Sequence, residues 1–255
     1  MESDNSNSVE RFSNRVANYV KYRPGYPAEM MAFFRERLGL EIGSVVADVG
    51  SGTGLSARPF LEAGCTVYGV EPNAAMREAA EDLLAEFPGF KSTDGTSAET
   101  TLGDASCDFV IAAQAFHWFE PQATRAEFRR ILKPGGYVAL IWNERQLDTT
   151  EFLREYEKLL LKYGRDYAEV RHEQIDEAVL GGFFQAEFGR ATFANRQVFD
   201  LAGLRGRLLS SSYMPDENDP AFPLLEKELE SLFAKHNESG RITVFYDTNV
   251  FYSRL

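Results

Sequence analysis

The stretch that decides the fold reads Val45-Val-Ala-Asp-Val-Gly50-Ser-Gly-Thr-Gly54. Its apolar first half is predicted to be a strand, and a helix is predicted to follow from about Leu55 to Ala63. Glycines at such a turn let the backbone bend tightly and let a ligand approach without a Cβ in the way. In open α/β sheets ligands bind outside the carboxyl ends of the strands, so this turn is the predicted centre of a binding site.

The alternation of strand and helix continues after the glycines. Further strands are predicted at residues 66–71, 90–93, 108–113 and 137–142, helices at residues 74–87 and 121–132, and a turn at Lys133–Gly136. Strands separated by helices indicate right-handed βαβ units. The sequence therefore predicts a doubly wound α/β fold, with a parallel sheet that carries helices on both faces.

The two ends of the chain do not follow this alternation. Residues 1–8 are predicted to be a flexible tail, and residues 9–22 a short helix that ends at the double-proline break Tyr22–Pro27. A second helix is predicted from Pro27 to about Leu38. After Asn143 the predicted elements are helices at residues 149–163 and 224–233, a strand near 186–193, and β-rich runs at 241–246 and 248–252.

Three parts are therefore expected after the tail. Residues 9–145 would form an α/β core with N-terminal lid helices. Residues 146–238 would form a mostly helical insert, which contributes the strand near 186–193. Residues 239–255 would supply a closing strand at the sheet edge.

Charge and composition limit the classes of function. The 255 residues include 27 Lys and Arg against 39 Asp and Glu, a formal net charge of −12. Proteins that bind nucleic acid normally carry a basic face, so this balance argues against a nucleic-acid partner. The hydrophobic fraction of 44% is ordinary for a globular protein and excludes collagen-like and wholly disordered classes. We expect a small-molecule partner and a monomer or homodimer.

The remaining composition signals are negative ones. Cys65 and Cys107 lie in apolar runs and are predicted to be buried thiols, too few for a disulfide framework or a zinc site. The three histidines are too scattered for a metal site. Residues 1–8 lack the basic and apolar regions of a signal peptide, and no run approaches the ~20 apolar residues of a membrane span. The expected location is cytoplasmic, with no membrane partner.

The spacing of the glycines limits the class of ligand that this turn can bind. A dinucleotide fingerprint needs a glycine where the chain has Leu55, and no Gly-Lys-Ser/Thr triplet follows for a P-loop. The tighter G-x-G-x-G form suits a nucleoside without a pyrophosphate. Glu71 ends the second predicted strand, where a carboxylate can accept hydrogen bonds from both ribose hydroxyls. Glu71 also favours a ligand that carries positive charge.

These residues carry a family resemblance. From about Val45 to Asn143 the chain resembles class I S-adenosylmethionine (SAM)-dependent methyltransferases, whose first motif is an acid-x-G-x-G-x-G run. It looks closest to the type 11 group, and within it to the branch that contains trans-aconitate methyltransferases. Besides the glycine turn, the motifs shared with the family or the branch are Tyr22–Pro27, Thr96–Glu99, Gln114–Phe119, Leu132–Gly136 and Val244–Tyr252.

The resemblance implies a Rossmann-like, mostly parallel seven-stranded sheet, with SAM as cofactor and S-adenosylhomocysteine as product. It also implies that residues 146–238 form a helical cap on the acceptor side. It assigns the methionine portion to Asp48 and the glycine turn, the ribose to Glu71, and the methyl end to Gln114. Thr96, Ser97 and Ala98 would surround adenine, although many relatives have aspartate where this chain has Ser97. The full set of expected cofactor residues is Tyr22, Arg23, Asp48, Gly50, Ser51, Gly52, Gly54, Glu71, Pro72, Thr96, Ser97, Ala98 and Gln114.

On the acceptor side, His117 is the candidate catalytic residue, as a general base or as a hydrogen-bond donor to the acceptor. The alternative is that His117, Trp118 and Phe119 wall the adenine or plug the end of the sheet. Arg23 suits a carboxylate of SAM or of the acceptor, with Tyr19 and Tyr22 as a lid or as core packing.

The other acceptor candidates are weaker. The substrate residues we expect are Tyr19, His117, Trp118 and Arg145. Arg205 and Arg207 are predicted on a solvated helix face, with binding of an acceptor carboxylate as the alternative. His172 and His236 are predicted on the surface, and Trp142 in the core, with a wall of the substrate site as its alternative.

The predicted function is methyl transfer from SAM to a small molecule, with a small carboxylic acid as the leading acceptor. The alternatives are a methyltransferase that acts on a protein or on tRNA, and a SAM-binding protein without turnover. A dehydrogenase that uses NAD is disfavoured by Leu55.

Overall fold

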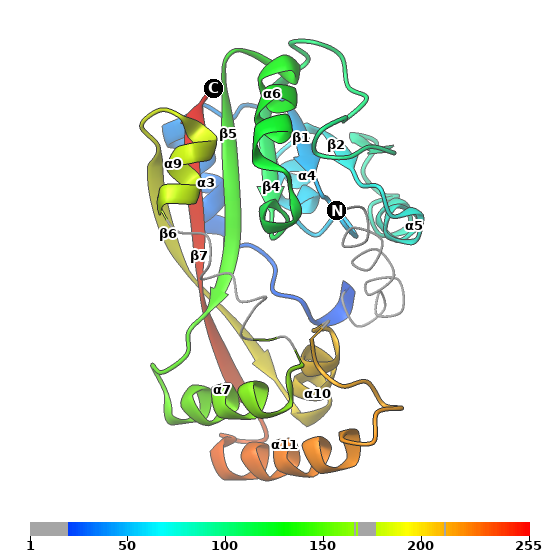
Figure 1. Cartoon of the computed structure of the whole chain (residues 1–255), viewed down its shortest axis with the longest axis vertical. Helices are drawn as coiled ribbons and strands as arrows, with labels where there is room; N and C mark the ends of the chain where they lie inside the picture. The colour runs from blue at the N-terminus through cyan, green and yellow to red at the C-terminus, as the bar shows by residue number, and fades with distance from the viewer. Residues whose placement is uncertain (1–19, 166, 168–176, 212) are drawn as a thin grey trace.

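The computed structural model describes residues 20–165, 167, 177–211 and 213–255 (Figure 1). The predictions for the tail, for most of the helix at residues 9–22, for Tyr19 and for His172 lie outside the described residues.

Seven strands form one sheet within the described part of the chain, in the order β3-β2-β1-β4-β5-β7-β6. The strands are β1 (Val45–Val49), β2 (Thr66–Val70), β3 (Phe90–Thr93), β4 (Cys107–Ala113), β5 (Leu132–Arg145), β6 (Gly189–Phe199) and β7 (Ile242–Arg254). Neighbouring strands from β3 to β5 pair in parallel, whereas β7 is antiparallel to both β5 and β6. The predicted Rossmann-like, mostly parallel sheet is confirmed.

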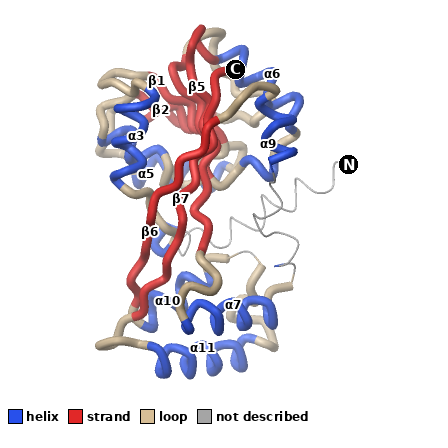
Figure 2. The backbone as a smooth tube through the Cα atoms, turned by 90° about the vertical axis from the view of Figure 1, so that its left-hand side faces the viewer, coloured by secondary structure: helices blue, strands red, loops and turns tan. Residues whose placement is uncertain are grey.

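Helices cover both faces of the sheet, and Figure 2 shows α3 and α5 on one side with α6 and α9 on the other. The helices of this half are α3 (Ala28–Leu38), α4 (Ala57–Glu62), α5 (Ala74–Leu83), α6 (Pro121–Ile131) and α9 (Glu177–Phe184). Val46 and Ile111 pack on the α3 and α4 side, and Ala47 and Val110 pack on the α6 and α9 side. The central strands are apolar throughout because both of their faces are buried.

The rest of the chain forms a second helical layer. Figure 1 shows α7 (Glu151–Tyr163), α10 (Leu201–Leu209) and α11 (Phe222–His236) at the end of the molecule away from α3 and α6, where the long β6 and β7 reach them. Their apolar faces share a hydrophobic core of their own, which includes Leu153, Leu204, Leu225 and the first half of β7. None of the described helices is long and apolar enough to cross a membrane.

Three predictions about strands need correction. The turn predicted at Lys133–Gly136 lies inside β5 as an irregularity, because Leu132 pairs with Cys107 and Tyr137 with Phe109. The strand near 186–193 is the longer β6. The runs 241–246 and 248–252 are the single strand β7, and it does not lie at the sheet edge: β6 pairs along its full length and forms the edge instead.

Candidate functional site

A cavity of about 470 Å³ opens beside the glycine turn, between the two helical layers. Gly50, Ser51 and Leu55 line it from the end of β1. The second side comes from the ends of β4 and β5, and the third from the cap. The residues that line it from the cap and from the N-terminal loop include Arg23, Pro24, Tyr26, Tyr167, Arg207 and Tyr213. The cavity thus joins the predicted cofactor half to the predicted acceptor half.

The backbone of the glycine turn requires glycine. Gly50 has φ +71° and Gly54 has φ +79°, a conformation that side chains disfavour. A Cβ on Gly50 would come within 2.6 Å of Cβ of Ala115, and one on Gly54 within 2.5 Å of Cδ1 of Leu84. Around Gly52, with φ +55°, no atom would lie within 4 Å of an added Cβ. Gly52 therefore leaves open space for a ligand.

Asp48 lies at the end of β1 and is fully buried. Its Oδ2 accepts a hydrogen bond of 2.6 Å from Oγ of Ser56, while its Oδ1 has no hydrogen-bond partner among the described residues. Burial raises the pKa of the Asp48 carboxyl to about 7, and the nearby charge of Glu71 adds to this rise. A buried oxygen without a partner fits a ligand that carries a positive charge or donates a hydrogen bond.

Glu71 follows β2 and holds the glycine turn in place. Its Oε2 accepts a hydrogen bond of 3.0 Å from the amide of Gly52, and its Oε1 accepts one of 3.0 Å from the amide of Asn73. Burial raises the pKa of this carboxyl, and the two backbone hydrogen bonds counteract the rise. Each oxygen keeps a second lone pair, so ribose hydroxyls can still donate to Glu71.

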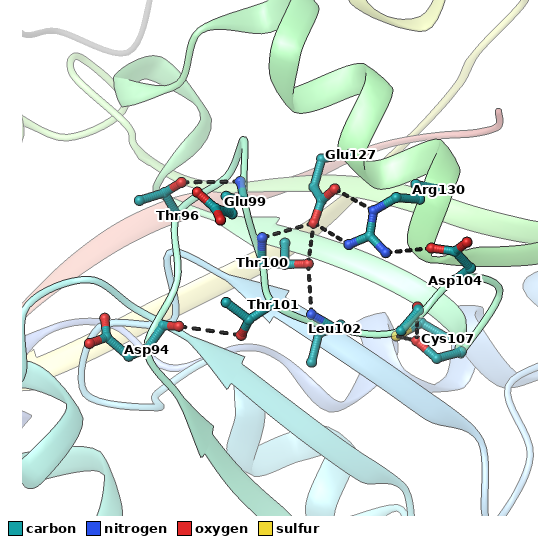
Figure 3. A network of polar contacts seen from close by, with 12 residues as sticks. Asp94, Thr96, Glu99, Thr100, Thr101, Leu102, Asp104, Cys107, Glu127 and Arg130 are labelled. Carbon is teal, nitrogen blue, oxygen red and sulfur yellow. Dashed lines mark hydrogen bonds and ion pairs between the residues drawn. The ribbon is translucent and has the colours of Figure 1, made fainter.

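The loop that carries Thr96, Ser97 and Ala98 is fixed by a residue that we did not predict. Oε1 of Glu127, on α6, accepts hydrogen bonds from the amide (2.8 Å) and the hydroxyl of Thr100, and the Arg130 guanidinium binds both of its oxygens (Figure 3). Thr124 donates a hydrogen bond of 2.9 Å to Oγ of Ser97 from the same helix. In the sequence, Glu127 reads as one more charge on a surface helix, so no pattern singled it out.

Gln114 follows β4 with φ +58°, and its Nε2 donates to the carbonyl oxygen of Asn143 at 3.2 Å. Nδ2 of Asn143 in turn donates to the carbonyl oxygens of Pro24 (3.2 Å) and Gly25 (3.1 Å). Asn143 therefore ties the double-proline loop to the end of β5. Arg23, in this loop, lines the cavity, whereas the ring of Tyr22 lies against Gly206 on α10.

His117 and Trp118 lie in the short 3₁₀ turn η1 (Phe116–Trp118) and do not line the cavity. Their rings contact each other with centroids 4.8 Å apart. This placement adds nothing to the catalytic role predicted for His117, which stays a prediction. Trp142 is buried against Phe116 and Phe251, in the core as predicted.

Arg145 lines the cavity but already has a carboxylate partner. It forms an ion pair with Glu157 and donates a hydrogen bond of 2.9 Å to the hydroxyl of Tyr167. Arg207 also lines the cavity, so the solvated helix face predicted for it is wrong. The prediction suits Arg205, whose ion pairs with Glu217 and Glu226 lie on the surface.

Comparison with known proteins agrees with this geometry. Residues 47–140 match the family model described as "Methyltransferase domain". An uncharacterised methyltransferase of Mycobacterium bovis is 34% identical over 160 residues, which cover 63% of this chain and 61% of that protein. The match thus spans less than two thirds of the relative's length.

Solved structures share the fold over nearly the whole chain. A candidate type II methyltransferase from Anaeromyxobacter dehalogenans superposes with a TM-score of 0.70 at 21% identity, covering 91% of this chain and 98% of that one. Phosphoethanolamine N-methyltransferase 2 of Haemonchus contortus, solved in complex with SAM, superposes with a TM-score of 0.51 at 18% identity, covering 96% of this chain and 56% of that one. The glycine turn, Glu71 and Gln114 all lie within residues 47–140, the part of the chain that matches the methyltransferase domain family.

Proposed function

We propose that this protein binds SAM and transfers its methyl group to a small-molecule acceptor, with a small carboxylic acid as the leading class. The observation that carries the proposal is the cluster at the ends of β1 and β2. There the amide of Gly52 donates to Glu71, the space beside Gly52 is open, and a buried oxygen of Asp48 lacks a partner among the described residues.

These residues fit a nucleoside that carries positive charge. Asp48 would bind the charged methionine portion, Glu71 and the adjoining Pro72 the ribose, and the loop with Thr96, Ser97 and Ala98 the adenine. SAM, when bound, supplies a methyl group that is already activated on a sulfonium. The protein then mainly has to align the acceptor and exclude water. Gln114 lies at the junction of the glycine turn and the cap, where the acceptor would meet the methyl group.

The cavity supports a small acceptor over a macromolecule. Its volume of about 470 Å³ lies in the range of small-molecule sites. The cap covers the acceptor side, and the net charge of −12 disfavours tRNA. A carboxylate acceptor carries no proton to lose, so this reaction needs no general base.

Two measurements test the proposal in order. Calorimetry should show binding of SAM and of S-adenosylhomocysteine, and the absence of binding to either would refute the cofactor assignment. A labelled-SAM assay against a panel of metabolites that includes small carboxylic acids should then show turnover. Label transfer to protein or tRNA fractions alone would favour a macromolecular acceptor. Binding without any transfer would favour a SAM-binding protein without turnover.

A further inference from the structure

Arg207 is a cation placed in the cavity and held there by neutral groups. Its Nε donates to the hydroxyl of Tyr246 at 3.3 Å, and its Nη1 donates to Oγ of Ser210 at 3.2 Å and to Oγ of Ser211 at 3.0 Å. The hydroxyl of Tyr246 donates onward to Oε1 of Gln197 at 2.9 Å, which fixes the tyrosine. The guanidinium is therefore oriented by the protein and has no donor bond from Nη2 to any described residue.

No carboxylate of the described residues lies within ion-pair distance of Arg207. In this respect Arg207 differs from two neighbouring arginines. Arg145, in the same cavity, is paired with Glu157, and Arg205, on the same helix, is paired with Glu217 and Glu226. A guanidinium shielded from water and without a counter-ion costs folding free energy. In a chain with 39 acidic residues and 27 basic ones, an arginine left without a carboxylate points to an anion supplied from outside.

A second guanidinium meets Arg207 at the same serine. Nη2 of Arg23 donates to the carbonyl oxygen of Ser210 at 3.0 Å, while Arg207 binds the hydroxyl of that residue. Both arginines line the cavity, and they lie 184 residues apart in the sequence. An anion bound beside both guanidinium groups would offset the repulsion between their charges. Paired guanidinium groups match the planar oxygens of a carboxylate.

Acidic residues also line the cavity. They are Glu144, Asp148 and Asp247, and Asp247 accepts a hydrogen bond of 3.0 Å from Gln146. Their negative charge disfavours an anionic ligand group beside them. An anionic group is favoured beside Arg207 and Arg23.

We propose that Arg207 and Arg23 form a carboxylate-binding subsite, which holds a carboxylate of the methyl acceptor other than the group that is methylated. A carboxylate held by two guanidinium groups has its lone pairs engaged and is a weak nucleophile, so the methylated atom must be a different one. The acceptor class is then a small acid with a second nucleophilic group. This proposal deepens the proposed function and rests on it.

The first test measures binding of simple carboxylates to protein saturated with S-adenosylhomocysteine. The probes are acetate, succinate and, as the neutral counterpart, succinamide, each titrated by calorimetry. We expect succinate to bind, succinamide to bind at least tenfold more weakly, and Arg207→Gln to weaken succinate about 10- to 100-fold, the range of a lost charge-assisted hydrogen bond. Arg207→Lys should restore part of the affinity. If wild-type protein binds neither carboxylate, or if Arg207→Gln binds both as tightly as wild type, the proposal is wrong.

Arg205→Gln is the matched control, because it removes the same charge from the same helix outside the cavity. It should leave carboxylate binding unchanged, and an equal loss in both variants would contradict a specific subsite. The melting temperature of ligand-free Arg207→Gln should equal or exceed that of wild type, since a cation without a counter-ion is removed. A large fall would instead indicate that Arg207 serves the fold.

A final measurement distinguishes binding of an acceptor carboxylate from binding of the carboxylate that the cofactor itself carries. Arg207→Gln should bind S-adenosylhomocysteine with wild-type affinity. A tenfold loss there would assign the subsite to the methionine carboxylate and overturn the acceptor assignment. If wild-type protein binds no S-adenosylhomocysteine at all, the proposed function fails, and the same titrations on ligand-free protein still decide whether Arg207 binds carboxylates.

Discussion

Oγ of Ser56 donates a hydrogen bond of 2.6 Å to Oδ2 of Asp48, and both side chains are buried beneath the glycine turn. Because burial raises the pKa of Asp48 to about 7, the free protein holds this carboxyl partly protonated at neutral pH. A cationic ligand prefers the ionised form. We therefore expect the affinity for SAM to rise as the pH increases from 6 to 8, with proton release on binding. Calorimetry in buffers of different ionisation enthalpy measures that release, and Asp48→Asn should abolish it.

The same carboxyl makes the free protein less stable at higher pH. The unfolded chain ionises Asp48 near its ordinary value of 3.8, so between about pH 4 and pH 7 the native state binds more protons than the unfolded state. Its contribution to stability is fully present below pH 4 and is lost as the pH rises to 7. The free energy of unfolding of wild type minus that of Asp48→Asn, from urea titrations, should fall across this window and level off above it. If this difference in free energy does not change with pH, the pKa of Asp48 is not raised in the native state.

Glu71→Ala should weaken binding of SAM and of S-adenosylhomocysteine by about 1–3 kcal/mol, because it removes the acceptors for the ribose hydroxyls. It also leaves the amide of Gly52 without the carboxylate to which it donates in the wild-type protein. Glu71→Gln keeps the size of the side chain and one carbonyl oxygen, so it should lose less. Calorimetry with S-adenosylhomocysteine gives both values, and equal affinity in all three proteins would exclude a ribose role.

Glu127→Ala should weaken binding of S-adenosylhomocysteine about tenfold, since the loop with Thr96–Ala98 loses the acceptor that Glu127 offers to the amide and hydroxyl of Thr100. Arg130 holds the pKa of Glu127 down to about 2, so the wild-type carboxyl stays ionised throughout the assay range. Asp104→Asn is the control, because Asp104 binds the same Arg130 from an exposed position. Equal losses in both variants would point to a general effect of Arg130 instead.

Glu157→Gln should lower the free energy of unfolding by about 3–5 kcal/mol, because Arg145 is then a buried cation without its partner. Replacing both residues, as in Arg145→Met with Glu157→Leu, should recover most of that loss. Urea titrations of the three variants provide the comparison. If the single variant is as stable as wild type, the ion pair does not stabilise the cap.

His117→Ala tests the remaining catalytic candidate. Since His117 does not line the cavity and a carboxylate acceptor needs no base, we expect turnover within about threefold of wild type and an unchanged pH profile. A loss of more than about a hundredfold with intact SAM binding would restore the general-base role.

The sequence predicted the part of the fold from β1 to β5 far better than the part after β5. β1 to β5 follow one another with a helix or loop between neighbours, so local apolar runs located them, and the same order located Asp48 and Glu71. β6 and β7 pair antiparallel with each other and β7 with β5, across intervals that no local pattern reveals. Arg205 and Arg207 look alike in sequence. Only the packing of α10 sends one to surface carboxylates and the other into the cavity.

The interior position of β7 sets a condition on synthesis of the protein. Among the described strands β6 pairs with β7 alone, so the edge of β5 and the whole of β6 lack a neighbouring strand until residues 242–254 have left the ribosome. Translation of the roughly 100 residues between β5 and β7 takes about 5–20 s. An apolar strand with an open edge attracts other chains during that interval. We therefore expect the nascent chain to need a chaperone before its last strand arrives, although the finished protein hides this dependence.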